Sequence, residues 1–252
     1  MNPIFVRFGL LTLCTILATG SGCVSSSPRE ALTEIAVGVR VDRMAQQVEV
    51  DGTIAIEVGI LEAAACMWKT REHESLVVVK ALPSAVHAAM LVAGFVPGKP
   101  GVWKEAFLES GEFDCLKLMK PQGELLAIDV RLADASVVPL TAWIRSTSGA
   151  QKFPEQPWIF AGSVFATNPK SWKEPGEHYV ADLTGQIIGI VTFGDEVIAF
   201  DEVLPDRADL AMPEWEVDSS RIPVPGTPVT LVIRKRTPEE QVTRAVSNAA
   251  TP

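Results

Sequence analysis

Two groups of side chains in this sequence could do chemistry. Arg71-Glu72-His73-Glu74 sets an imidazole between two carboxylates, and His87 follows a short distance along the chain. Imidazole and carboxylate ligands together suit zinc, iron or manganese. Glu72, His73, Glu74 and His87 are therefore candidate residues for binding a metal ion or a small ligand. They support one hypothesis, a metal-binding protein or metal-dependent enzyme that uses His73 or His87.

The elements that would hold these residues limit that chemistry. Residues 74–94 predict a strand, a tight turn and a helix: the apolar run 76–79 is typical of a buried strand, Pro83 ends it, and Ser84 and Gly94 suit the two caps of a helix over 85–93. The strand would extend about 25 Å, and the helix would double back with His87 one turn into it. The two histidines would then lie on the order of 20 Å apart, so one metal ion could not bind both.

A metal site would thus need His73 or His87 alone, with distant partners such as Glu62 or His178. The other interpretation is structural. Arg71 would pair with its acidic neighbours at the entrance of a strand. His87 would be a neutral, hydrogen-bonded residue in the first turn of a helix, where the dipole disfavours its positive charge.

Common catalytic motifs are absent from the sequence. Residues 161–165, AGSVF, lack the second glycine of GxSxG, and there is no HExxH, GxxxxGK[ST] or GxGxxG. The net charge of −9, without a dense Lys/Arg run, argues against nucleic-acid binding. We therefore predict no catalytic residues and no nucleic-acid partner. Trp103 and Trp172 lie in polar contexts typical of exposed binding positions.

The N-terminus predicts export and lipid anchoring. Arg7 precedes an apolar run over residues 8–18, which is typical of a secretory signal and too short to span a bilayer. Cys23, directly after Ser21-Gly22, resembles the bacterial lipobox, in which this cysteine is diacylated, although Gly20 stands where leucine is usual. The alternative is an ordinary secretory signal cleaved nearby. The absence of Asp after Cys23 favours the outer membrane over the inner one, with the domain facing the periplasm.

The sequence divides into four predicted segments. These are a signal peptide over 1–22, a lipid-anchored Ser-rich tether over 23–36, a single domain over 37–236, and a short helix or disordered tail over 237–252. The last begins with Thr237-Pro238-Glu239-Glu240, a capping-box pattern.

The cysteines allow two interpretations. With Cys23 acylated, Cys66 and Cys115 remain as an even pair, which could form a disulfide in an oxidising compartment. They could equally be two buried free thiols. The sequence has no CxxC and too few cysteines for an iron–sulfur cluster or a four-cysteine zinc site, so we predict no such cofactor.

For the domain we predict an α+β fold, mostly antiparallel strands with one clear strand-turn-helix unit at residues 74–94. Asp51-Gly52 between residues 47–50 and 53–60 is typical of a hairpin turn. Residues 178–183, 186–193 and 196–200 predict a three-stranded meander, with Gly194-Asp195 as its second turn. Residues 228–234 predict a last strand.

The run from Leu61 to Gly101 resembles the YdjY-like family of exported bacterial proteins. The matching residues are Leu61-Glu62, Cys66, Arg71 to Leu76, Pro83-Ser84-Ala85, His87-Ala88-Ala89, Gly94 and Pro97-Gly98, with Trp158 to Ser163 further along. The resemblance implies no activity. A ferredoxin-like cofactor, named for some relatives, would need cysteines that this chain lacks. The favoured function is a non-catalytic cell-envelope lipoprotein that binds a partner protein or a small ligand.

Overall fold

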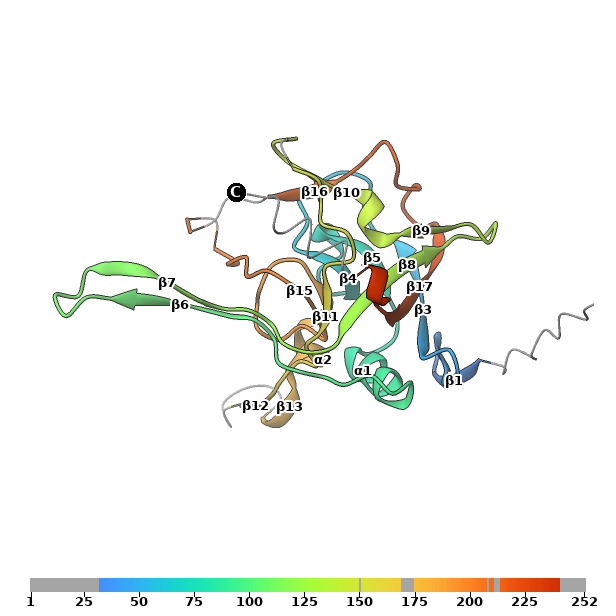
Figure 1. Cartoon of the computed structure of the whole chain (residues 1–252), viewed down its shortest axis with the longest axis horizontal. Coiled ribbons are helices and arrows are strands. Elements are labelled where there is room, and N and C mark those ends of the chain that lie inside the picture. The colour runs from blue at the N-terminus through green and yellow to red at the C-terminus, as the bar shows by residue number, and fades with distance from the viewer. Residues whose placement is uncertain (1–31, 150, 169–174, 208, 211–213, 241–252) are drawn as a thin grey trace, which may run out of the picture.

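The computed structural model describes residues 32–149, 151–168, 175–207, 209–210 and 214–240 (Figure 1). The predicted signal peptide, Cys23 and Trp172 lie outside these residues. Strands make up 44% of the structure and helices 13%. The predicted α+β fold is therefore wrong, because the fold is mostly β and is organised by a closed sheet rather than by the strand-turn-helix unit.

The strands and helices follow one another along the whole described chain. The strands are β1 Thr33–Ala36, β2 Val39–Asp42, β3 Gln47–Ile54, β4 Ala63–Met67, β5 Ser75–Val79, β6 Val102–Phe107, β7 Phe113–Met119, β8 Leu125–Arg131, β9 Val137–Pro139, β10 Ile144–Ser146, β11 Trp158–Phe160, β12 Phe165–Asn168, β13 Gly176–Tyr179, β14 Gln186–Gly189, β15 Ile198–Phe200, β16 Trp215–Val217 and β17 Pro228–Lys235. The helices are α1 Pro83–Val92 and α2 Val180–Thr184, with short 3-10 helices η1 Glu72–Glu74 and η2 Leu140–Trp143.

Eight strands close into a barrel in the order β3, β17, β8, β11, β15, β14, β4 and β5, with β5 returning to β3. Strands β1 and β2 continue the sheet beyond β3, and β9 pairs with β8. The pairs β4–β5 and β14–β15 are parallel, and the other neighbours around the barrel are antiparallel. Three two-stranded sheets, β6–β7, β10–β16 and β12–β13, lie outside the ring. Within the described ranges, no helix is long and apolar enough to cross a membrane.

The Asp51-Gly52 hairpin prediction is wrong, because β3 runs straight through both residues. One edge of β3 pairs with β2 as far as Val50, and from Gly52 onward the same edge pairs with β5. A Cβ atom on Gly52 would lie 2.6 Å from Val77 Cγ1 and 2.9 Å from the Val78 carbonyl oxygen. Because Gly52 has no side chain, β5 can approach β3 and close the barrel. Glycine within a strand often marks such a close approach of another backbone.

The predicted meander over 178–200 is also wrong. Residues 180–184 form α2, which ends at Gly185 in the left-handed conformation with φ 81°. Strands β14 and β15 are parallel neighbours, so Gly194-Asp195 makes no hairpin turn between them. Residues 190–197 form a loop that returns along the barrel, and the Glu196 carboxylate accepts hydrogen bonds from the backbone of that loop.

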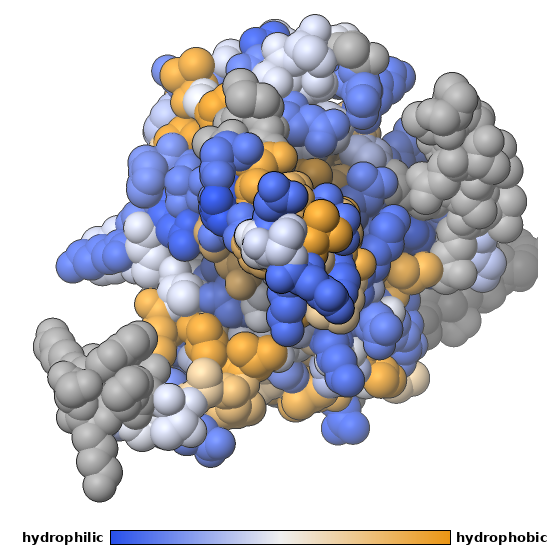
Figure 2. Space-filling view, turned by 90° about the vertical axis from the view of Figure 1, so that its left-hand side faces the viewer, coloured by the Kyte–Doolittle hydropathy of each residue, from blue (hydrophilic) through white to orange (hydrophobic). Residues whose placement is uncertain are grey.

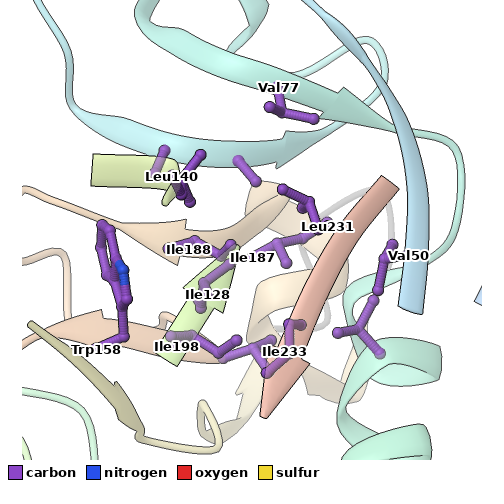
Figure 3. Packing of buried hydrophobic residues seen from close by; sticks show 14 of the residues in the cluster. Val50, Val77, Ile128, Leu140, Trp158, Ile187, Ile188, Ile198, Leu231 and Ile233 are labelled. Carbon is purple, nitrogen blue, oxygen red and sulfur yellow. The ribbon is translucent and has the colours of Figure 1, made fainter. Parts of the chain in front are cut away.

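The core fills the barrel with branched and aromatic side chains (Figure 3). Trp158 and Phe160 of β11 are fully buried, and isoleucines from β8, β14, β15 and β17 surround them. Each fully buried aliphatic side chain of this size contributes roughly 1.5–3 kcal/mol. Strand β5 is one of the eight strands of this barrel. Helix α1 begins at Pro83, with Leu82 rather than Ser84 as its N-cap, and packs outside against β2 and β3.

Candidate functional site

Two short loops meet at one end of the barrel. Residues 68–74 join β4 to its parallel neighbour β5, and residues 190–197 join β14 to its parallel neighbour β15. Such connections usually take a dozen residues or more, so these two lie tight against the barrel. Both contact Glu62: the backbone amides of Ile190 and Val191 donate to its carbonyl oxygen at 2.9 Å, and Arg71 binds its carboxylate.

Arg71 is the centre of the polar network at this end. Its Nη1 lies 3.0 Å from Glu62 Oε2 and 3.1 Å from Glu74 Oε1. The guanidinium also stacks 4.0 Å over the centre of the Phe193 ring, an arrangement that favours a cation on an aromatic face. Ser75 Oγ donates to the Arg71 carbonyl oxygen at 2.8 Å. The predicted pairing of Arg71 with neighbouring carboxylates is therefore present, and it extends to Glu62.

A hollow of about 230 Å³ opens next to this network. It is lined by Gly101, Val102 and Trp103, by Thr192, Phe193 and Gly194, and by Asp206. The Trp103 indole Nε1–H donates to the Thr192 carbonyl oxygen at 3.2 Å, which joins the two walls. Asp206 is exposed and makes no ion pair with the part of the chain that the structure describes.

Several carboxyl groups around the hollow bind protons more tightly than usual. Burial, followed by the nearby Glu74 carboxylate, raises the pKa of Glu62 to about 7, while Arg71 opposes this shift and Asp206 adds to it. Burial raises the pKa of Glu196 to about 7 as well, against hydrogen bonds from the backbone of its own loop. Burial also raises the pKa of Asp195, which Thr184 and Arg71 partly offset. Perturbed carboxyls gathered beside a hollow are typical of binding and catalytic sites.

The histidines predicted as candidates lie in different surroundings. His73 belongs to η1, is largely exposed, and places Nε2 3.5 Å from Glu74 Oε2. Residues 72–74 form a 3-10 helix at the entrance of β5. The Glu72 carboxylate accepts a hydrogen bond from the backbone amide of Lys69. No group of three or more His, Cys, Asp or Glu side chains among the described residues is placed to hold a metal ion.

His87 is a half-buried residue of α1. Tyr179 donates its hydroxyl proton to the Gly162 carbonyl oxygen at 3.0 Å, so the His87 Nδ1–H donates to the Tyr179 oxygen at 2.7 Å. Its ring also lies edge-on to Phe160. Burial lowers the pKa of His87 and raises that of Tyr179, so this chain of hydrogen bonds holds both groups in their neutral forms.

Three of the segments that carry the family resemblance lie against one another around His87. The backbone amide of Gly98 donates to the Phe160 carbonyl oxygen at 2.9 Å. A Cβ atom on Gly162 would lie 2.8 Å from Pro97 Cβ and 3.4 Å from His87 Cε1. Residues 87, 97–98 and 158–163 are thus packed against one another, which is a structural reason for their shared pattern.

The two cysteines lie in different elements and are free thiols in this structure. Cys66 is buried in β4, and Cys115 is exposed on β7 of a projecting hairpin (Figure 1). Of the two interpretations left open by the sequence, the structure has free thiols rather than a disulfide, and only Cys66 of the two is buried. Burial raises the pKa of the Cys66 thiol, which disfavours its reactive thiolate form.

Sequence reasoning missed much of the hollow. It singled out Trp103, which is part-buried in the structure rather than exposed, but not Asp206 or the loop over 190–197. The signal available was the pair Asp195-Glu196, two carboxylates between the apolar runs 186–191 and 197–200. Charges enclosed by buried segments are costly unless they bind something, and Glu196 binds the backbone amides of Phe193 and Gly194.

The fold and the site together define a class: a mostly β barrel with a hollow lined by Asp206 and two aromatic rings, beside two tight parallel connections. The sequence matches the YdjY domain over residues 39–234, from β2 into β17, and the chain belongs to that family. No curated protein and no solved structure matches the chain.

Proposed function

We propose that this chain is an exported lipoprotein, acylated at Cys23 and anchored to the outer membrane, whose barrel binds a ligand or partner in the periplasm without catalysing a reaction. The support for the anchor is the sequence: a basic residue, a short apolar run, and a cysteine directly after two small residues. The Ser-rich residues after Cys23 would hold the domain away from the lipid surface.

The hollow beside Trp103 is the proposed binding site, and a cationic group such as an amine is the ligand that fits it best. The observation that carries this proposal is that Asp206 lines the same hollow as Trp103 and Phe193, close enough to Glu62 to affect its pKa. Carboxylates attract a cation, and aromatic faces add to that attraction. Arg71 is already engaged by Glu62, Glu74 and Phe193, so a ligand would meet the acidic side of the hollow.

Calorimetric titration tests the binding site. The probe is 1,4-diaminobutane, and its uncharged counterpart 1,4-butanediol reports binding that does not depend on charge. We expect the diamine to bind and the diol not to bind. Asp206→Asn should weaken diamine binding about tenfold, equivalent to about 1.4 kcal/mol. Glu57→Gln is the matched control, since Glu57 is exposed and lies outside the hollow.

Equal weakening in the Asp206 and Glu57 variants would mean that only the net charge attracts the diamine. Absence of diamine binding to the unaltered chain would contradict a site for amines in the hollow.

The anchor has a separate test. Cys23→Ser should abolish labelling of the chain by a radioactive fatty acid and release the protein from the membrane fraction. Cys14→Ser is the control and should change neither, because Cys14 follows Leu13 rather than a small residue. A Cys23→Ser protein that stays with the membrane would show that the anchor was misidentified.

A further inference from the structure

The hairpin β6–β7 projects from the barrel as a separate two-stranded arm (Figure 1). Its base, Gly101 to Trp103, forms one wall of the hollow. Near that base, Arg207 binds Glu105 at 2.7 Å and ties the arm to the segment that carries Asp206. A two-stranded hairpin in water is marginally stable by itself. The long, apolar outer half of this arm therefore needs a further contact to stabilise it.

Most of one face of the arm is apolar, while Glu105 at its centre is held by Arg207 and Trp103 at its base contacts Thr192. The register pairs Trp103 with Leu118, Glu105 with Leu116 and Phe107 with Phe113, so these residues share a face. The Phe107 and Phe113 rings lie edge to face with their centres 6.3 Å apart. Phe107 is 58% exposed, and Phe113 and Leu118 are 52% exposed. Figure 2 looks at the molecule from the side to which the arm points, and hydrophobic and hydrophilic side chains lie side by side at its centre.

The charges along the arm suit a second arm running in the opposite direction. Glu109, in the acidic turn at the tip, lies four residues along the chain from Glu105, the partner of Leu116, and Lys120 lies four residues from Leu116 toward the base. Each is about 13 Å from Leu116 at ~3.3 Å per residue. A two-fold axis at Leu116 therefore brings the tip of one arm to Lys120 of the other. The same axis sets the Phe107–Phe113 rung of one arm on the Trp103–Leu118 rung of the other.

We propose that two copies of this chain associate through the apolar faces of their β6–β7 arms, antiparallel about a two-fold axis at Leu116. Such an interface is self-complementary, as two-fold symmetry requires. Leu116 meets Leu116, the Phe107–Phe113 rung meets the Trp103–Leu118 rung, and acidic tips meet lysines. Glu105, which shares the central rung, keeps its ion pair with Arg207 of its own chain. A membrane surface fits less well, because Glu109, Glu112 and Asp114 at the tip would be repelled by anionic lipid. The proposal does not depend on which ligand the hollow binds, and Trp103 is the residue that the hollow and the arm share.

Sedimentation velocity of the full chain, with Cys14 and Cys23 changed to serine, tests the association. We expect a concentration-dependent dimer. Leu118→Asp and Phe113→Asp should each raise the dissociation constant at least about tenfold, since each puts a charge into the apolar contact. Val58→Asp is the matched control, because Val58 is 73% exposed and lies away from the arm. Thermal unfolding of all variants should match that of the unaltered chain, since the arm is outside the core.

Charge exchange tests the antiparallel arrangement itself. Lys120→Glu alone and the pair Glu109→Lys with Glu112→Lys should each weaken the dimer, and all three changes together should restore it. A nitroxide on the exposed Cys115 should show dipolar coupling between two copies, because packed sheets lie about 10 Å apart. The proposal would be overturned by a chain that stays monomeric at its solubility limit, by a dimer that the arm variants leave unchanged, or by charge exchange without recovery.

Discussion

At the scale of single residues, Glu196 explains how the loop over 190–197 keeps its shape. Its side chain is 1% exposed, and Oε1 accepts hydrogen bonds from the backbone amides of Phe193 and Gly194. Its Oε2 is buried with no hydrogen-bond partner among the described residues. A buried acceptor without a partner favours the protonated acid, which agrees with the raised pKa of this group.

The stability of the protein should therefore depend on the protonation of Glu196. Its pKa is about 7 in the folded chain against 4.5 in a model compound, so the folded state binds the proton more tightly. The resulting stabilisation is complete below pH 4.5 and is lost as the pH rises through 7. The shift corresponds to about 3 kcal/mol. Glu196→Gln, which does not titrate, should remove that loss, as measured by chemical denaturation at pH 4.5, 6 and 8.

Asp195 and Glu62 also have raised pKa values, so the unaltered chain should lose stability over the same range for more than one reason. The difference between the two proteins at each pH isolates Glu196. A difference in unfolding free energy that stays constant from pH 4.5 to 8 would contradict this account.

At the scale of elements, the closure of the barrel depends on Gly52. We expect Gly52→Ala to destabilise the fold by roughly 1–3 kcal/mol, because the added methyl would overpack the junction of β3 and β5. Val77→Ala removes the side chain nearest to that methyl. The double variant should therefore lose less unfolding free energy than the sum of the losses in the two single variants. Unfolding in urea measures this coupling. Strictly additive losses would show that Gly52 and Val77 do not meet.

The elements also show what the sequence could predict. The apolar run 76–79 and the helix after Pro83 were readable because each depends on its own residues: β5 and α1 occupy Ser75–Val79 and Pro83–Val92. The hairpin predictions at Asp51-Gly52 and Gly194-Asp195 were wrong because these dipeptides are compatible with structures other than a hairpin turn. Asp51-Gly52 lies inside a strand, and Gly194-Asp195 lies in a loop between parallel strands. Whether a glycine turns a chain or admits a neighbouring strand depends on residues far along the sequence, here Val77 and Val78.

At the scale of the whole molecule, the barrel brings together groups that no local pattern links. The hollow and its network combine Glu62, Arg71, Trp103, Phe193 and Asp206, from five separate segments. Sequence reasoning identified Arg71 and its carboxylates as a polar cluster, and noted Trp103 and Glu62 for other reasons. It could not place them side by side, because their positions follow from the parallel pairs β4–β5 and β14–β15.

The most direct test of the central claim is a titration of the ¹⁵N-labelled chain with 1,4-diaminobutane, followed through the indole N–H signals of its six tryptophans. Trp103→Phe identifies the Trp103 signal. We expect a saturable shift of that signal, because the Trp103 indole joins the walls of the hollow, while the signals of buried Trp143 and Trp158 stay in place. An unmoved Trp103 signal, or equal shifts of all the tryptophan signals, would contradict a binding site for amines in the hollow.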